Sequence, residues 1–220
     1  MPHKVKEIEE MRVKYKDVFH LKNLYIMLHE YLYEEGWYGT PKAEKQGERY
    51  ISMAHLNIEK LYLEKFCQTG LHSGGKEMWV WWRLQKAPDT KFNAYFKYRL
   101  DMDFHMVYLQ NREVMHQGKK MKVQWGEIEI FIRPWIEGDI NGQWEKHWFL
   151  KHMQALYEER LLIQEMDKRE KELWREAYRL QGVIKRYFNM RTFIPVPEPF
   201  HHAVYGYEAE PNPGGPLPTK

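Results

Sequence analysis

Two acidic residues and a histidine alternate near the middle of the chain, where Asp101, Asp103 and His105 occupy every second position. In a β-strand, alternate side chains share one face of the sheet and lie about 7 Å apart. Two carboxylates at that separation can share a divalent cation, with the imidazole at the edge of the site. The spacing therefore makes these three residues candidate metal ligands.

The acid-x-acid pair on a strand resembles the metal-binding element of several nucleotidyl- and glycosyl-transferring folds, and that resemblance implies metal-dependent group transfer. The glycine pair Gly74-Gly75 lies too far upstream to form a phosphate-binding turn beside the acids. The alternative is a solvated sheet face, on which the basic residues Lys97 and Arg99 pair with Glu127 and Glu129 across strands.

A basic stripe lies near the end of the chain. Its members are Arg175, Arg179, Lys185 and Arg186. At helical spacing, and with aromatic residues among them, they are candidates for binding RNA or another phosphate group. Basic residues near a helix C-terminus also complement the helix dipole, which requires no ligand.

Large apolar side chains occupy the other face of the predicted sheet. They are Trp82, Phe96, Tyr98, Met102, Phe104, Met106 and Trp125. A curved sheet closed by a helix can enclose a pocket for an apolar ligand, and these residues are the candidates to line it. The alternative is an ordinary core without a cavity.

Strict alternation predicts the strands that carry these residues. Apolar residues occupy every second position from 92 to 108, and the same period appears over 78–84 and 121–132. At Gly126 the alternation changes phase by one residue, which is typical of a β-bulge. We expect one strongly curved antiparallel sheet of about four strands over residues 77–137, with turns at 87–89 and near Asn111 or Gly118.

Helical spacing of apolar residues predicts helices on both sides of that sheet. The N-terminal helical region spans residues 4–70, with helices over 5–35 and 48–67. The C-terminal region, 143–190, is predicted to be almost continuous, which at 1.5 Å per residue is about 70 Å. A helix longer than the globule must kink, at Gly182 or within 165–172, or else project and contact a protein partner or a second copy of the chain.

The fold class that follows is α+β: N-terminal helices, the curved sheet and a long C-terminal helix in one domain, residues 1–194. Seven of the eleven prolines fall in a Pro/Gly-rich tail, 195–220. This order of elements resembles helix-grip folds, which wrap a sheet around a terminal helix and often hold hydrophobic ligands. The resemblance concerns element order alone.

Composition narrows the functional classes. The net charge of +3 is too small to indicate a nucleic-acid binder by itself, and the single cysteine, Cys67, excludes an internal disulfide. The longest apolar cluster, 78–82, is too short to span a membrane, so we expect a cytoplasmic protein. Because no catalytic motif is present, we expect a non-enzymatic binding or assembly protein without a cofactor, with the metal-dependent enzyme and the RNA binder as alternatives.

Overall fold

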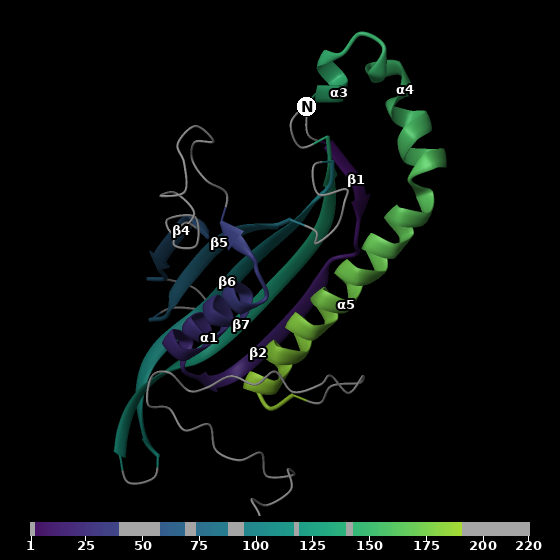
Figure 1. Ribbon diagram of the computed structural model, residues 1–220. Helices are drawn as coiled ribbons and strands as arrows, with labels where there is room; N and C mark the ends of the chain where they lie inside the picture. Colours follow the sequence, from purple (N-terminus) through teal and green to yellow (C-terminus); the bar gives the residue numbers. More distant parts are fainter. Residues whose placement is uncertain are drawn as a thin grey trace, which may run out of the picture.

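The computed structural model describes residues 3–39, 58–68, 74–87, 95–116, 119–139 and 143–190. These residues form one seven-stranded antiparallel sheet with helices packed against one face (Figure 1). The strands are β1 (His3–Glu7), β2 (Met11–Phe19), β3 (Tyr38–Gly39), β4 (Glu59–Phe66), β5 (Lys76–Lys86), β6 (Lys97–His116) and β7 (Lys119–Gly138). The predicted tail, 195–220, lies outside the described residues.

The two N-terminal strands pair with the last strand of the sheet. The strand order is β1-β7-β6-β5-β3, with β2 also pairing with β7 and β4 also pairing with β5. β2 therefore continues along the edge of β7 where β1 ends, and β4 and β3 together border β5. The expected four strands are too few, because β1, β2, β3 and β4 all lie in regions that were predicted to be helix or loop.

The predicted helix over residues 5–35 is wrong in its first half. Met11, Val13 and Tyr15 turn toward the core of the protein while Arg12 and Lys14 lie on the opposite face, which is the period-two pattern of a strand. The helix begins only at Leu21, and α1 spans Leu21–Glu34. The basic residues of β2 find carboxylate partners on β7, and that pairing fixes the strand.

The predicted helix over residues 48–67 is also wrong where the structure describes it. Residues 59–66 form β4, which pairs antiparallel with β5 from Glu59 opposite Trp82 to Phe66 opposite Lys76. Every residue of β4 is exposed, so its apolar side chains are not the buried stripe of a helix. Residues 48–57 lie outside the described part of the chain.

The strands predicted over 78–84, 92–108 and 121–132 correspond to β5, β6 and β7, although residues 92–94 lie outside the described part. β6 and β7 are longer than predicted and bend along their length (Figure 1). Of the two positions predicted for the next turn, Asn111 is wrong, because β6 continues to His116 and pairs with β7 as far as Lys119. The other position, Gly118, falls between these two strands and lies outside the described residues.

The predicted bulge is present at Gly126, but the extra residue is on β6. Tyr108 and Leu109 together face Gly126, and Tyr108 adopts a positive φ of 57°. A Cβ atom on Gly126 would lie 2.9 Å from the carbonyl oxygens of Val107 and Tyr108, and one on Gly75 would lie 2.7 Å from the Tyr108 Cα. A glycine on β7 and another immediately before β5 therefore make room for the bulge.

The C-terminal region is not one continuous helix. It consists of α3 (Gln143–Lys146), α4 (Leu150–Leu156), a single π-helical turn η1 (Tyr157–Leu161) and α5 (Ile163–Tyr187). The breaks fall at residues 147–149 and 157–162, and α5 runs without interruption through both sites where a kink was predicted. The predicted resemblance to helix-grip folds is not supported, because two strands precede the first helix and the C-terminal region is not a single long helix that closes the sheet.

The core lies between the inner face of the sheet and two helices, α1 and α5. Inner-face residues such as Met102, Ile130 and Ile132 are fully buried. α5 contributes a stripe of buried residues at three- and four-residue spacing, Leu162, Met166, Arg169, Leu173, Ala177, Leu180 and Ile184. The only charged residue in this stripe, Arg169, is 1% exposed.

Candidate ligand-binding groove

A groove of about 530 Å³ lies between α1 and the inner face of the sheet. Most of the side chains around it are apolar. Its lining residues are Leu21, Lys22, Leu24, Tyr25, Ile26, Glu59, Tyr62, Met78, Val80, Phe104, Met106 and Gln124. This volume lies within the range of small-molecule sites. A few polar groups among apolar walls are also typical of a ligand pocket.

Strand alternation and the start of α1 fix the walls of the groove. Phe104 and Met106 point inward from β6, and Val80 points inward from the neighbouring β5. The first turn of α1 is held by the Nδ1 atom of His20, which accepts a hydrogen bond from the Asn23 amide at 3.2 Å. The side chain of Gln124 accepts a second hydrogen bond from the Leu21 amide at 3.0 Å, which ties α1 to β7.

A chain of hydrogen bonds supplies polar groups in the wall of the groove. The indole Nε1 of Trp82 donates to the Tyr25 hydroxyl at 3.0 Å, and that hydroxyl donates to a Glu59 carboxylate oxygen. Burial, and next the hydrogen bond to Glu59, raise the pKa of Tyr25 well above its ordinary value. The hydroxyl therefore stays protonated at neutral pH and keeps its role as a donor.

A second, more polar hollow of about 500 Å³ adjoins this groove. The two share Leu21, Met78 and Gln124 as lining residues. The second hollow adds polar and charged side chains, Glu64, Lys76, Gln110 and Asn111. Together the two hollows form a trough with an apolar section and a polar section, which suits a molecule with both kinds of surface.

The apolar residues that were predicted to line a pocket lie in different parts of the structure. Phe104 and Met106 line the groove, whereas Trp82 is buried behind the lining residues Tyr25 and Phe104. Phe96, Tyr98 and Met102 belong to the buried core elsewhere, and the hydroxyl of Tyr98 bonds to Glu172 and Arg169. Trp125 lies at the bulge, against the ring of Tyr108 and the guanidinium of Arg112.

Sequence reasoning missed the half of the groove that comes from α1 and β4. Leu24 and Tyr25 carry the helical periodicity that identified α1, but nothing in that pattern places α1 over β5 and β6 rather than elsewhere. Glu59 and Tyr62 were assigned to a helix, whereas both lie on β4. The missing signal is strand pairing, which local periodicity does not contain.

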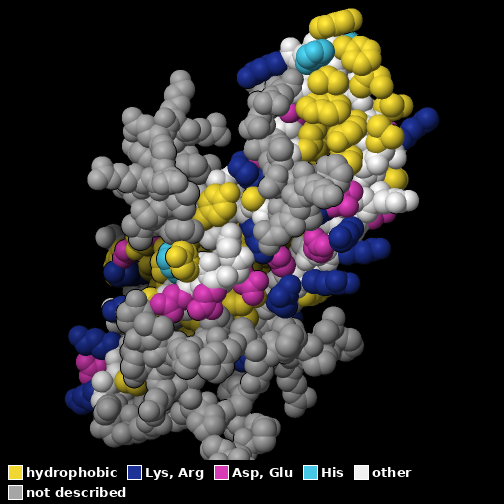
Figure 2. Space-filling view, viewed as in Figure 1, with side chains coloured by type: hydrophobic (Ala, Val, Ile, Leu, Met, Phe, Trp, Pro, Cys, Tyr) yellow, Lys and Arg dark blue, Asp and Glu magenta, His cyan; other side chains and the backbone are white. Residues whose placement is uncertain are grey.

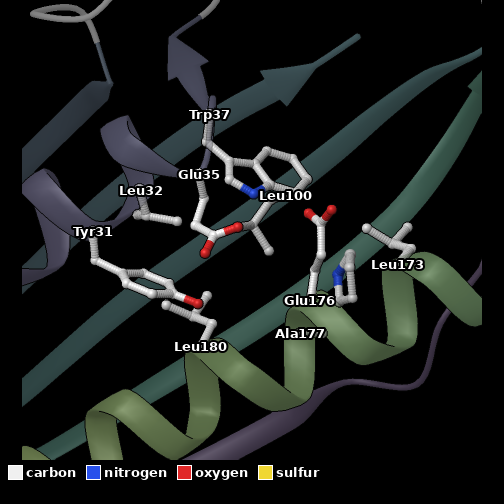
Figure 3. Close-up of a pocket in the computed structure, with 10 residues that line it drawn as sticks. Tyr31, Leu32, Glu35, Trp37, Leu100, Leu173, Glu176, Ala177 and Leu180 are labelled. Atoms are coloured by element: carbon white, nitrogen blue, oxygen red, sulfur yellow. The ribbon is translucent and has the colours of Figure 1, made fainter. Parts of the chain in front are cut away.

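A much smaller cavity lies where α1 and α5 face each other (Figure 3). Its volume is about 10 Å³, room for no more than one water molecule. One oxygen of Glu176 accepts a hydrogen bond from Lys86 at 2.8 Å, and the other has no hydrogen-bond donor among the described residues. This cavity is a packing feature between helices and not a ligand site.

On the outer face of the sheet, the candidate metal ligands are bound to basic and aromatic side chains. Arg83 Nη1 lies 2.6 Å from Asp103 Oδ1, and Arg133 also forms an ion pair with Asp103. Arg83 Nε lies 3.6 Å from Asp101 Oδ1. His105 stacks on the ring of Trp79 with the centroids 3.7 Å apart, and its Nε2 lies 3.0 Å from a Glu77 oxygen.

These contacts lend the metal hypothesis no support. Within the described residues, no group of three or more His, Cys, Asp or Glu side chains is arranged to hold a metal ion. The alternative of a charge-paired face fits better, but its partners differ from those expected. Arg99 pairs with Glu137 at 2.7 Å, and Glu129 pairs with Arg12 and Lys14, because β2 borders β7 along that edge.

Glu129 gives this face a pH dependence. Hydrogen bonds from Lys14 and, to a lesser degree, from Arg12 hold the pKa of Glu129 below its ordinary value of 4.5. A carboxylate with a depressed pKa in the folded state stabilises the fold above its unfolded pKa, and this contribution is lost as the pH falls through the folded pKa. We expect Glu129→Gln to lower the free energy of unfolding at pH 7 and to reduce its loss below pH 4.5.

Urea unfolding of both proteins at pH 7 and pH 3 measures this effect. The exposed Glu10, whose Oε2 lies 3.3 Å from Arg133, provides the matched control through Glu10→Gln. Equal pH dependence in wild type and Glu129→Gln would contradict the prediction.

The candidate basic stripe of α5 divides between exposed and partly buried positions. Arg175 and Arg179 are exposed, with the stacked rings of Trp174 and Tyr178 beside them. Lys185 is half-buried and donates to Gln181 at 3.1 Å, and Arg186 is also half-buried. Figure 2 shows acidic side chains interspersed with the basic ones over this part of the surface.

Exposed apolar side chains gather at the end of the molecule formed by α3, α4 and η1 (Figure 2). Trp148 is 80% exposed. The others are Phe149, Met153, Leu156, Leu161 and Ile163. We refer to these six residues as the helical tip. Exposed apolar side chains are common singly, but a cluster of this kind is less usual.

Comparison with known proteins identifies no relative: no family model matches the chain, and no curated protein or solved structure is significantly similar to it. Among the described helices, none has the length and hydrophobicity needed to cross a membrane.

Proposed function

We propose that this chain is a non-enzymatic cytoplasmic binding protein that holds an apolar or amphipathic small molecule in the groove between α1 and the sheet. The observation that carries the proposal is the volume of about 530 Å³ lined mainly by apolar side chains of α1, β4, β5 and β6. The rest of the inner face is packed, so the groove is a local feature of this end of the sheet.

The chemistry of the walls defines the class of ligand. Phe104, Met106 and Val80 provide an apolar surface for a hydrocarbon or ring system. Methionine side chains are flexible and polarizable, so they adapt to ligands of different shape. Lys22 at the groove offers positive charge, whereas Lys76 in the adjoining hollow is paired with Glu64, so an anionic head group of an amphipathic ligand would lie beside Lys22.

Isothermal titration calorimetry with a medium-chain fatty acid, dodecanoate, tests the proposal. We expect saturable binding of one molecule per chain with a negative heat-capacity change, the signature of apolar burial. Met78→Glu places a charge in the wall shared by both hollows and should abolish binding. Val114→Glu introduces the same charge at an exposed position of β6 and should leave binding unchanged.

Two results would contradict the proposal. One is the absence of heat and of thermal stabilisation with dodecanoate and with an uncharged alkane-chain analogue of the same length. The other is equal binding by Met78→Glu and wild type. Circular dichroism of the variant separates a lost site from a lost fold.

Assembly through the helical region stays a second hypothesis, supported by the exposure of Trp148 and Phe149. The partner would be a protein with an apolar recess for these two rings. Trp148→Ser should weaken such a complex, whereas Arg175→Ser on the exposed face of α5 should not.

The metal-dependent enzyme and the RNA binder also stay predictions. The first requires thermal stabilisation by Mg²⁺ or Mn²⁺ that is lost in Asp101→Asn/Asp103→Asn. The second requires binding to RNA with a steep dependence on salt, reduced by Arg175→Ala/Arg179→Ala. No stabilisation by either ion, and no binding to RNA at low salt, would remove them.

A further inference from the structure

Strand β4 forms an exposed edge of the sheet. In the part of the chain that the structure describes, its residues 59–66 pair with β5 on one side only. Four of its side chains are large, apolar and between 45% and 59% exposed: Leu61, Tyr62, Leu63 and Phe66. An edge strand of this length with apolar side chains on both faces is a template for pairing with another strand.

The sequence of β4 is complementary to itself. If a second copy pairs antiparallel with Tyr62 opposite Tyr62, then Leu61 of each copy faces Leu63 of the other, and Lys60 faces Glu64. Lys60 is the extra residue between Glu59 and Leu61 in the β4–β5 pairing, and this register requires its side chain to lie on the inner face with Glu64. Each contact occurs twice, because the pairing is two-fold symmetric.

Shifted registers lose this complementarity. A shift of one residue in one direction places Lys60 opposite Lys65, and a shift in the other direction places Glu59 opposite Glu64. Like charges directly opposite each other destabilise a strand pair, and a one-residue slip also moves side chains to the wrong face. The charged residues that protect an edge strand against random partners therefore select one register when the partner is the same strand.

From these observations we propose that the chain forms a symmetric homodimer in which the two β4 strands pair antiparallel about Tyr62. The sheet then runs without interruption from one protomer into its partner. Residues directly opposite in an antiparallel pair point to the same side of the sheet, so the two-fold axis is perpendicular to the sheet. Tyr62 lines the groove, so the two grooves open on the same face and meet at the dimer seam.

The local structure supports Glu64 as a charged partner. Its Oε1 lies 2.6 Å from Lys76 Nζ, and its Oε2 accepts a hydrogen bond from the Tyr62 hydroxyl at 2.6 Å. This arrangement holds the carboxylate on the inner face, beside the edge of β4 that pairs with no other strand among the described residues. A lysine from the second copy would approach it from the side opposite to Lys76.

Sedimentation equilibrium and light scattering over a range of concentrations test the proposal on the full chain. We expect a concentration-dependent species of twice 27.0 kDa. Lys60→Glu and Glu64→Lys should each raise the dissociation constant by roughly tenfold or more, since each places two like-charged pairs in the interface. A mixture of the two variants restores both opposite-charge pairs and should form a heterodimer with wild-type affinity.

Cysteine cross-linking gives a second test that does not depend on charge. In a Cys67→Ser background, Tyr62→Cys should form a disulfide-linked dimer under mild oxidation, because position 62 faces itself across the two-fold axis. Leu63→Cys, whose own counterpart is offset by two residues, should cross-link much less.

Three outcomes would overturn the proposal: a monomer at every concentration, a dimer insensitive to both charge variants, or equal cross-linking at positions 62 and 63. A dimer that persists in Lys60→Glu but dissociates in Trp148→Ser would place the contact at the helical tip instead. These results are independent of ligand binding in the groove.

Discussion

Replacing Arg169 with methionine should lower the free energy of unfolding by about 3 kcal/mol. The guanidinium is buried in the apolar stripe of α5, where Nε and Nη2 donate to Glu165 Oε1 at 2.9 and 2.5 Å. Nη1 also donates to the buried Tyr98 hydroxyl at 3.4 Å. Methionine fills similar volume but leaves the carboxylate and the hydroxyl without their donor, which is the costly way to break a buried ion pair.

Chemical unfolding of the full chain measures this difference. Arg175→Met is the matched control, because Arg175 lies on the exposed face of the same helix and its loss should change stability by less than about 0.5 kcal/mol. A double replacement, Arg169→Met with Glu165→Met, should recover part of the loss, because the Glu165 carboxylate is then removed together with its partner. Equal stability of Arg169→Met and wild type would show that the charge network does not stabilise the fold.

Replacing Gly126 with alanine should destabilise the protein by about 2 kcal/mol or more. The new Cβ would lie 2.9 Å from two backbone oxygens of the β6 bulge, and backbone atoms cannot move aside as the end of a flexible side chain can. Relief requires the bulge to shift, which disturbs the pairing of β6 with β7 on both sides.

The midpoint of urea unfolding tests this effect, with Lys122→Ala as the control on the exposed part of β7. Gly75→Ala should act in the same direction, because its Cβ would lie 2.7 Å from the Cα of Tyr108. If the two glycine variants are close to wild type in stability, the tight approach of three strands at Tyr108 is contradicted.

The middle of the fold could be predicted from sequence because its strands carry their own signal. From Tyr98 to Met106, uninterrupted alternation reflects one buried and one outer face, and the change of phase at Gly126 located the bulge to the correct strand pair. The extra residue was assigned to the wrong strand, because a phase shift on β7 does not reveal that Tyr108 adopts a positive φ on β6.

The strands at the two edges of the sheet, β2 and β4, could not be predicted, because the spacing of their apolar residues is compatible with a helix as well as with a strand. In β2, Met11, Tyr15 and Val18 are compatible with a helix, and the strand is distinguished by its pairing with β7, where Arg12 and Lys14 both contact Glu129. In β4 the apolar residues are exposed on both faces, so burial provides no periodic signal. The length of the C-terminal helix was overestimated for a related reason. The π-helical turn that begins at Tyr157 interrupts neither the spacing of apolar residues nor the composition of the sequence, so the sequence does not reveal it.

The candidate site was only half predictable. Phe104 and Met106 were found by alternation, but the same rule also selected Tyr98 and Met102, which are core residues. Burial alone does not separate a pocket wall from a core, because the difference lies in what covers each residue. That cover is α1, and its position follows from the tertiary structure.

Pairing of β2 with β7 also determines when the chain can fold. Met11 faces Ile132 and Phe19 faces Gln124, so more than a hundred residues separate the partners. During synthesis, the first two strands must wait with their edges unpaired until the last strand has left the ribosome. Closing such long loops makes folding slow. We therefore expect a chaperone that shields Met11–Phe19 during this interval to raise the yield of native protein.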